Sequence, residues 1–330
     1  MPTLAEIVQE AARRQRAGLV SSWQAEAKRL ARVYGNMYLD IQAEIELLSE
    51  GVEAGDYTRR TVKQSDRYQK LISQVLIALG GFSALTLSTA RDLQSGAIIK
   101  GQQDTKRLVD IQTGGGLEYF AVPRDAMQVL IEYLGRGYPL WNRIDGLSRY
   151  GADLVTSAIL DAIGSGFNAT ETARAIRGAF GTPLSDSLRI TRTVTAWSYR
   201  ETNRLSYMTN PQAVEGWIWY SALDPGRTCM SCVNMHGTFH TPDEVLNDHH
   251  NGLCTSIPKV VGVDALVTES GEQWFNQQGE QVQRQMMGKG KYQQWQDGTF
   301  GIGDMSRPYQ DEVFGEMLGE KSLKDILDGR

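Results

Sequence analysis

The sequence predicts a mainly α-helical protein, with a long N-terminal helical hairpin or bundle, a second helical domain and a small α+β module that contains cysteine and histidine. Ala, Gln, Glu, Arg and Leu dominate the N-terminal part, where apolar residues such as Ile41, Ile45 and Leu48 recur at helical spacing. All three cysteines and all four histidines lie instead within residues 229–254. This separation predicts a helical scaffold that carries one small, chemically distinct module.

The first region, residues 1–120, is predicted as an elongated helical hairpin or bundle. A helical pattern covers residues 4–53, and two further helical tracts follow between residue 68 and about residue 111. Gly35 is a candidate bend in the first tract, and Gly80-Gly81 ends the longest apolar run. Because few turn signals interrupt these tracts, a bundle fits them better than a compact enzyme domain.

The second region, residues 121–210, is also predicted to be helical. Asn168 can cap one of its helices, and Pro183 is expected to end that helix because proline cannot donate a backbone hydrogen bond. The helices are expected at residues 126–134, 142–164, 169–179 and 184–209.

The third and fourth regions differ in character from the helical part. Residues 211–260 are predicted as the small α+β module, in which the bulky run at residues 216–220 favours a strand. Residues 261–330 are predicted as a Gln-rich helical tail, with helix-like spacing over residues 273–296 and a short helix at residues 322–327.

The composition and net charge of the chain argue against several classes of protein. The chain has 330 residues and a net charge of -5, which argues against a dedicated nucleic-acid-binding protein with a basic face. Three cysteines are too few, and odd in number, for a disulfide framework, so folding in a reducing cytoplasm is expected. No secretory pattern and no uncharged apolar run of about 20 residues is evident, and no membrane partner is expected.

The cysteines and histidines have spacings typical of a metal site. Cys229 and Cys232 form a Cys-x-x-Cys pair, which places two thiolates on one side of a tight turn. Cys254 and a histidine from a second loop could complete a tetrahedral zinc site, with His249 or His250 as the fourth ligand and His240 and His236 as weaker candidates. Four such ligands leave no open position, so structural zinc is favoured over catalytic zinc.

Three other interpretations use the same residues. Buried cysteines and hydrogen-bonded histidines without metal would fit the pattern as well. Residues 248–251 are similar to the acidic–histidine pairs of small HNH-like, metal-dependent nucleases, in which His249 or His250 would activate water, but the second Cys pair of such domains is missing. A thioredoxin-like function is disfavoured because no strand–helix alternation surrounds the Cys-x-x-Cys pair, and the pair opens no evident helix.

A longer pattern surrounds the cluster and points to a family. The pattern starts at Arg192-Thr193 and resembles the phage Mu F-like head morphogenesis domain of minor head (minor capsid) proteins of tailed bacteriophages. That domain passes from an Arg-Thr-Glu helix and a Trp into Asp-x-Arg-Thr-Cys-x-x-Cys, and ends in His-Pro-Asn-Cys-Arg-Cys. The resemblance extends over residues 140–258, and its signature residues here are Trp219, Asp224, Arg227, Thr228, Cys229, Cys232, His249, Asn251 and Cys254.

The chain departs from the family pattern at three places. Val194 replaces the acidic residue after Arg-Thr, one extra residue lies between Asp224 and Arg227, and Gly252 stands where the family usually has a cysteine. The resemblance implies a metal site of Cys229, Cys232, Cys254 and His249, with His250 as the alternative ligand.

The resemblance also implies a non-catalytic role in head assembly. A protein of this family is expected inside the capsid near the portal, after synthesis in the bacterial cytoplasm. Its expected partners are the portal protein, the major capsid or scaffolding protein, and packaged DNA. The expected function is to assist procapsid assembly or the packaging and delivery of DNA, and the alternative is the metal-dependent nuclease.

Overall fold

The computed structural model describes residues 1–264, 266–267 and 269–329, and it confirms the predicted mainly α-helical fold. Helices account for 66% of the chain, and the strands form small sheets in its C-terminal part. Residues 265, 268 and 330 of the predicted C-terminal region lie outside the described part.

The chain divides into two compact units, each built from discontinuous segments, whereas the sequence analysis divides it into four consecutive regions. The bundle unit comprises Ser22–Leu93 and Glu132–Val194. The sheet unit comprises Met1–Ser21, Gln94–Ile131 and Thr195–Arg330. The Cys/His segment therefore belongs to a unit that also contains the start of the chain.

Long helices contribute residues to both units. They are α1 (Leu4–Glu53), α2 (Asp66–Thr113) and α6 (Ala169–Thr209), and the shorter α3 (Arg124–Glu132) follows α2. α1 agrees with the predicted helix, but α2 is continuous where the sequence analysis expects two tracts. Gly80 and Gly81 each cost a helix about 1 kcal/mol relative to alanine. Burial of Val75, Leu79 and Phe82 on the opposite face of α2 outweighs that cost.

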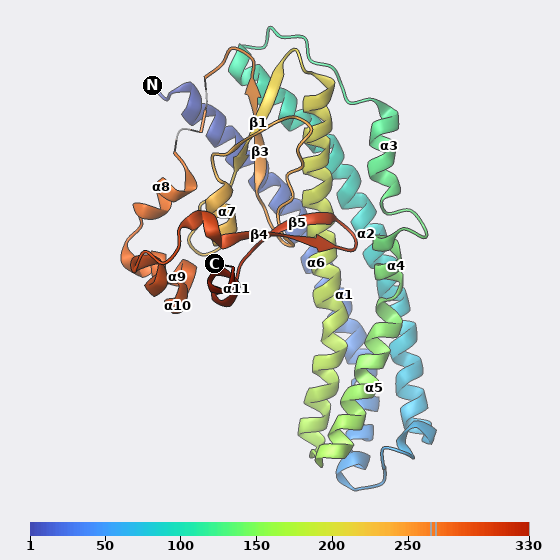
Figure 1. The fold of residues 1–330 in the computed structure, drawn as a ribbon. Coiled ribbons are helices and arrows are strands. Elements are labelled where there is room, and N and C mark those ends of the chain that lie inside the picture. Colours follow the sequence, from blue (N-terminus) through green and yellow to red (C-terminus); the bar gives the residue numbers. More distant parts are fainter. Residues whose placement is uncertain (265, 268, 330) are drawn as a thin grey trace. The chain divides into compact units, whose positions relative to one another are not determined.

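An apolar core of the bundle unit is contributed by α1, α2, α5 and α6. The other elements of this unit are η1 (Val62–Gln64), α4 (Pro139–Asp145) and α5 (Leu147–Ser165). Figure 1 shows the helix segments of this unit side by side. Tyr34 is the aromatic centre of the core, with its ring centroid 4.7 Å from that of Phe82 and 4.9 Å from that of Phe180. These rings fix how the helices pack against one another.

The predicted helix end at Pro183 is wrong, because α6 continues through this residue. Proline removes one backbone donor and its ring crowds the carbonyl four residues earlier, which normally kinks or ends a helix. Here the Tyr34 hydroxyl donates a hydrogen bond to the Phe180 carbonyl in the turn before the proline. The carbonyl that lacks its helix donor is that of the neighbouring residue Ala179, and burial of Phe180 in the bundle core holds this turn of α6 in place.

The sheet unit contains a small antiparallel sheet in the order β2-β1-β3. Its strands are β1 (Val214–Tyr220), β2 (Phe239–His240) and β3 (Thr255–Val260). Trp217 and Trp219 of β1 pack with Tyr207 of α6, whereas Ile218 and Tyr220 pack in a second cluster with residues of α1 and α2. Because both faces of β1 are covered, the strand is a continuous bulky run rather than an alternating one.

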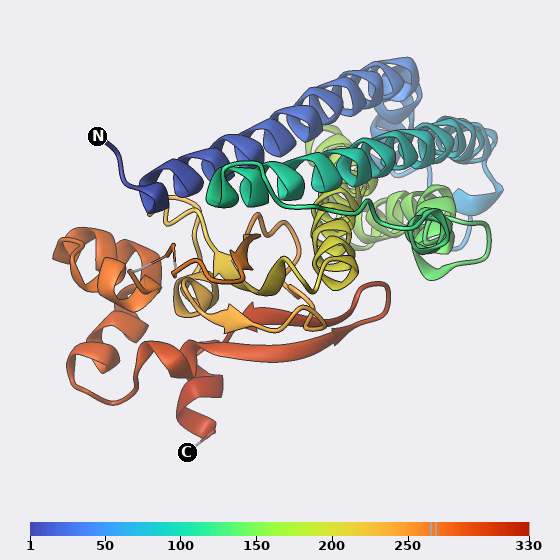
Figure 2. The same cartoon turned by 90° about the horizontal axis from the view of Figure 1, so that it is seen from above.

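The C-terminal part of the sheet unit is a folded subdomain built on the short helix α7 (Met230–Met235). The predicted Gln-rich helix is three short helices, and the β4–β5 hairpin that follows was not predicted (Figure 2). Met230 and Val233 of α7 pack in one core with Phe275, Ile302 and Met305. The remaining elements are α8 (Gly271–Asn276), α9 (Glu280–Met287), α10 (Lys289–Gln296), η2 (Ile302–Met305), β4 (Ser306–Asp311), β5 (Gly315–Glu320) and α11 (Leu323–Asp328).

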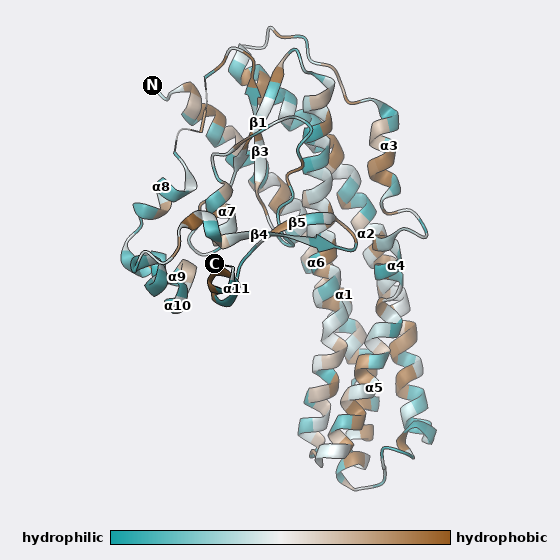
Figure 3. Ribbon diagram, in the orientation of Figure 1, coloured by the Kyte–Doolittle hydropathy of each residue, from teal (hydrophilic) through white to brown (hydrophobic). Residues whose placement is uncertain are grey.

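Among the described residues, α2 is the one helix long and apolar enough to cross a membrane by length and composition. Its most apolar 18-residue window has a mean hydropathy of 1.7, and 33% of that window is buried. Figure 3 shows apolar positions along α2 and α5 in brown. A core helix of a globular protein passes the same test, and Leu71, Val75 and Leu79 belong to the bundle core.

Candidate metal centre

A tight turn delivers the Cys-x-x-Cys pair. The Asp224 carbonyl accepts hydrogen bonds from the backbone N–H groups of Arg227 and Thr228, and the Thr228 hydroxyl accepts one from the Asp224 N–H at 2.9 Å. Cys229 is the N-cap residue of α7, and Cys232 lies in the first turn of that helix. The pair therefore opens a short helix, contrary to the sequence-based expectation.

A second tight turn brings the other sulfur and the imidazole. Residues 248–254, here called the ligand loop, turn back through a hydrogen bond from the Gly252 N–H to the His249 carbonyl at 2.9 Å. Asn251 takes a left-handed φ of 61°, a conformation that asparagine adopts more readily than most residues. β3 starts directly after Cys254, so the cysteine is held at the beginning of a strand.

The two turns bring the predicted ligands together. His249 Nε2 lies 3.1 Å from Cys229 Sγ and 3.5 Å from Cys232 Sγ. The donor atoms of these three residues lie within 4.8 Å of one another, and those of Cys232, Asp248 and Cys254 form a second such group. Cys254 therefore adjoins the first three through Cys232. Together Cys229, Cys232, His249 and Cys254 are called the Cys/His cluster.

The orientation of the His249 ring suits a ligand that binds through Nε2. His249 Nδ1 lies 2.7 Å from the His250 carbonyl oxygen, which can only accept a hydrogen bond. This contact assigns a proton to Nδ1 and directs Nε2 toward the thiols. Zinc-binding histidines commonly show this arrangement, in which one ring nitrogen is fixed by an outer hydrogen bond.

Close contacts within the cluster shift the pKa values of its titratable groups. Hydrogen bonding from Cys232, with smaller contributions from His249 and Ser231, outweighs burial and lowers the pKa of Cys229 to about 4. Burial disfavours the imidazolium of His249, but the hydrogen bond with Cys229 and the charge of Asp248 raise its pKa to about 10. The hydrogen bond between the two thiols of Cys229 and Cys232 raises the pKa of Cys232. Without a metal, the geometry favours a thiolate–imidazolium pair between Cys229 and His249.

Arg200 and Asp248 form a buried ion pair beneath the ligand loop that the sequence analysis misses. The Arg200 Nη2 atom lies 2.8 Å from Asp248 Oδ2, and the two side chains are 5% and 1% exposed. Arg200 also donates hydrogen bonds to the carbonyls of Gly252 (2.8 Å) and Cys254 (2.9 Å). A charged residue within the otherwise mostly uncharged stretch 193–200 of α6 is the one sequence signal that could have revealed it.

No side chain larger than hydrogen fits at Gly252. A Cβ atom there would lie 2.1 Å from Asp248 Oδ2 and 2.3 Å from Asp248 Cγ. The backbone of Gly252 lies outside the left-handed region, so the nearby carboxylate rather than φ requires glycine. The Asp248 carboxylate thus occupies the space that a side chain at residue 252 would need.

The other three histidines have their own partners. His250 Nε2 lies 2.8 Å from Asp311 Oδ2 on the β4–β5 hairpin, so its ring turns toward that hairpin. His236 Nδ1 accepts a hydrogen bond from the Ser221 N–H at 3.0 Å, and burial lowers its pKa to about 4. His240 stacks on Trp217 with centroids 4.2 Å apart. The structure places His249 in the cluster and gives the other three a role in packing.

The remaining signature residues lie around the cluster rather than in it. Trp219 is 1% exposed, and its backbone pairs with residues 237–238 near α7. Asp224 and Thr228 form the turn before Cys229, and Asn251 forms the turn of the ligand loop. Arg227 is exposed, and its Nε atom lies 3.9 Å from Asp224 Oδ2. Trp219 and the turn residues therefore position the cluster.

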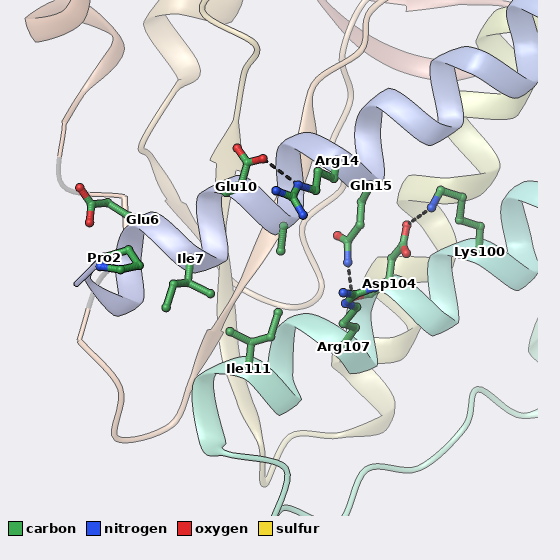
Figure 4. Close-up of a pocket in the computed structure, with 11 residues that line it drawn as sticks. Pro2, Glu6, Ile7, Glu10, Arg14, Gln15, Lys100, Asp104, Arg107 and Ile111 are labelled. Atoms are coloured by element: carbon green, nitrogen blue, oxygen red, sulfur yellow. Dashed lines mark hydrogen bonds and ion pairs between the residues drawn. The ribbon is translucent and has the colours of Figure 1, made fainter.

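A cleft of about 430 Å³ lies elsewhere in the sheet unit, between the start of α1 and the second half of α2 (Figure 4). Glu10 pairs with Arg14 at 2.7 Å, and Lys100 pairs with Asp104 at 2.7 Å. Ion pairs within the lining leave little net charge to select a ligand, and the cleft contains no residue of the Cys/His cluster.

Comparison with known proteins gives no relative for this chain. No family model matches it, and no curated protein and no solved structure is significantly similar to it. The chemistry of the cluster therefore rests on its donor atoms. Three sulfurs and one imidazole nitrogen are a ligand set typical of zinc. Magnesium and calcium bind oxygen ligands instead.

Proposed function

We propose that the chain is a minor head protein of a tailed phage, and that its Cys/His cluster is a structural zinc site. The observation that carries the zinc proposal is the convergence of Cys229, Cys232 and His249, with Cys254 next to Cys232. The head-protein proposal rests on the resemblance of residues 140–258 to the Mu F-like domain. The packing of Trp219 and the two turns around the cluster supports it.

Zinc would supply a cross-link between two loops of a small module. Cys229 and Cys232 come from the N-cap and first turn of α7, whereas His249 and Cys254 come from the ligand loop. Cys229, Cys232 and His249 would hold the ion, and Cys254 would close the site from the side of Cys232. Because such a site exists only in the folded chain, metal binding adds directly to the stability of the fold.

The proposed role in the head is non-catalytic. α1 spans 50 residues and α2 spans 48 residues, which gives the chain long surfaces for contact with the portal and with the major capsid or scaffolding protein. A net charge of -5 limits unselective contact with packaged DNA. His249 Nε2 is directed at the Cys229 thiol and His250 Nε2 contacts Asp311, so the geometry gives less support to a nuclease in which either histidine would activate water.

The zinc proposal is tested by elemental analysis of purified protein. We expect about one zinc per chain in the wild type, with loss in the Cys229→Ser and Cys254→Ser variants, because each removes one of four ligands. His250→Ala is the matched control, since His250 bonds to Asp311 and should leave zinc content unchanged. Zinc at background level in the wild type would contradict the proposal.

The assembly role is tested by co-expression with the portal and procapsid proteins of the same phage. We expect the chain to co-purify with the portal or with procapsids, and to be incorporated less into particles when Cys229→Ser removes a zinc ligand and destabilises the Cys/His module. The same preparations are assayed for nicking of plasmid DNA. Failure to co-purify would contradict the head-protein proposal, and nicking that is lost in His249→Ala would favour the nuclease.

A further inference from the structure

The ligand loop is attached to α6 by a single arginine. Arg200 donates to the Asp248 carboxylate, to the Gly252 carbonyl and to the Cys254 carbonyl, with N···O distances of 2.8 to 2.9 Å. These bonds hold both ends and the turn of the loop that carries His249. They need no metal, and all of them are buried. The loop is therefore fixed in place by an ion pair on one side and by the cluster on the other.

We propose that Arg200 and Asp248 are the positioning pair of the zinc site, which hold His249 and Cys254 in ligating geometry before the ion binds. This inference rests on the proposed structural zinc site. Neither residue touches the ion in this scheme. Outer groups that orient metal ligands commonly matter for affinity almost as much as the ligands do, because they remove the entropy cost of ordering a loop.

Asp248 meets the distance criterion for a ligand but is committed to other partners. Its Oδ2 atom accepts hydrogen bonds from Arg200 at 2.8 Å and from the Cys254 N–H at 3.1 Å. Its Oδ1 atom accepts one from the His249 N–H at 2.9 Å. Asp248 thus binds the backbone of both ligand residues of the loop, which makes it a brace for them. Its Oδ1 atom also lies 3.4 Å from Cys232 Sγ, so the carboxylate contacts both ligand-bearing turns.

Gly252 leaves the space that the Asp248 carboxylate occupies. A Cβ atom at residue 252 would lie 2.1 Å from Asp248 Oδ2. A side chain at residue 252 and the carboxylate of Asp248 therefore exclude each other. Glycine at this position allows Asp248 to lie between Arg200 and the Cys254 N–H.

The inference is tested with Arg200→Gln in the full-length protein. The control is Arg204→Gln, one turn further along α6, where Arg204 pairs with Glu201 at 2.9 Å. Zinc affinity is measured by competition with a chromophoric chelator, and Co²⁺ is used as a spectroscopic probe of the ligand set. We expect Arg200→Gln to weaken zinc binding by about 10- to 100-fold and to reduce the thiolate-to-Co²⁺ charge-transfer band. Arg204→Gln should match the wild type.

Hydrogen exchange provides a readout that a merely structural role would not give. In metal-free protein the Cys254 N–H, bonded to Asp248, should exchange slowly in the wild type and rapidly in Arg200→Gln. Saturating zinc should restore protection in the variant, because the ion then orders the loop that the pair no longer holds. Loss of protection that zinc does not restore would contradict positioning.

Arg200→Lys keeps the test decisive if Arg200→Gln does not fold. Lysine keeps the charge opposite Asp248 but cannot reach all three acceptors, so zinc affinity should still fall by about 10-fold in a folded protein. Wild-type affinity in either variant would overturn the positioning role while leaving the zinc site intact. A wild type that binds no zinc would overturn the zinc site and the positioning role together.

Discussion

Replacing Gly252 with alanine gives the sharpest structural prediction. The added Cβ atom would lie 2.1, 2.3 and 2.5 Å from Oδ2, Cγ and Oδ1 of Asp248, where ordinary contacts are 3.4–4 Å. Either the carboxylate or the ligand loop must move by about 1 Å. Moving the carboxylate breaks its buried pair with Arg200, and removing one partner of such a pair costs about 3–5 kcal/mol.

Moving the loop instead is the cheaper response. Overpacking a closely packed site costs about 1–3 kcal/mol. The Gly252 and Cys254 carbonyls both accept hydrogen bonds from Arg200, so a shifted loop also strains those bonds and the cost should lie in the upper part of that range. We therefore expect Gly252→Ala to destabilise the sheet unit by about 2–3 kcal/mol.

The assay is native-state hydrogen exchange of backbone amides in β1, because the two compact units need not unfold together. Gly226→Ala is the matched control in the same module, since its Cβ atom would meet Asp224 Oδ1 at an ordinary 3.5 Å. That control should change stability by no more than about 1 kcal/mol, in the stabilising direction.

A double-mutant cycle isolates the cause. In an Arg200→Met/Asp248→Ala background, which removes both charges, the cost of Gly252→Ala should fall below about 0.5 kcal/mol because the carboxylate is gone. The same loss of stability in both backgrounds would refute the argument that Asp248 requires glycine at residue 252.

Three further outcomes are expected. Zinc affinity should rise with pH between about pH 6 and pH 8, by at least about 100-fold per unit, because binding displaces protons from His249 (pKa about 10) and from Cys232, whose pKa is raised. Chelator competition that is independent of pH would contradict this. Folding lowers the pKa of His236 from 6.5 to about 4, so the unfolded chain binds more protons than the folded chain between pH 6.5 and pH 4. The free energy of unfolding should therefore fall by up to about 3 kcal/mol over that range. A His236→Asn variant with the same pH dependence in urea unfolding would show that another group is responsible. Tyr34→Phe removes the hydrogen bond to the Phe180 carbonyl and should destabilise the bundle unit by about 1–2 kcal/mol, with unchanged stability counting against the account of α6.

Features set by local sequence could be predicted, and features set by distant partners could not. Ile41, Ile45 and Leu48 mark one face of α1, and this periodicity alone predicts the helix. Pro183 misleads because the turn before it is packed in the bundle core, where Phe180 contacts Tyr34, a residue 146 positions earlier in the chain. Helix propensity describes single residues and does not include contacts from another helix.

The candidate site also has parts that the sequence predicts and parts that it does not. The residue types and spacing of Cys229, Cys232, His249 and Cys254 single out the residues that the structure brings together or side by side. Arg200 is 48 residues from Asp248 in the sequence, so its isolation as a charge in the stretch 193–200 of α6 predicts burial but does not identify its partner. The hairpin that binds His250 is also missed, because Pro308 and Gly319 weaken the strand signal of β4 and β5.

The central claim is that Cys229, Cys232, His249 and Cys254 hold one zinc ion as a structural element. Native mass spectrometry of the intact wild-type chain, before and after removal of metal with a chelator, tests it most directly. We expect one bound zinc per folded chain, and removal of the ion should lower the stability of the module while the Arg200–Asp248 pair still holds the ligand loop. A folded wild-type chain whose mass shows no metal, and whose module is no more stable with added zinc, would contradict the claim.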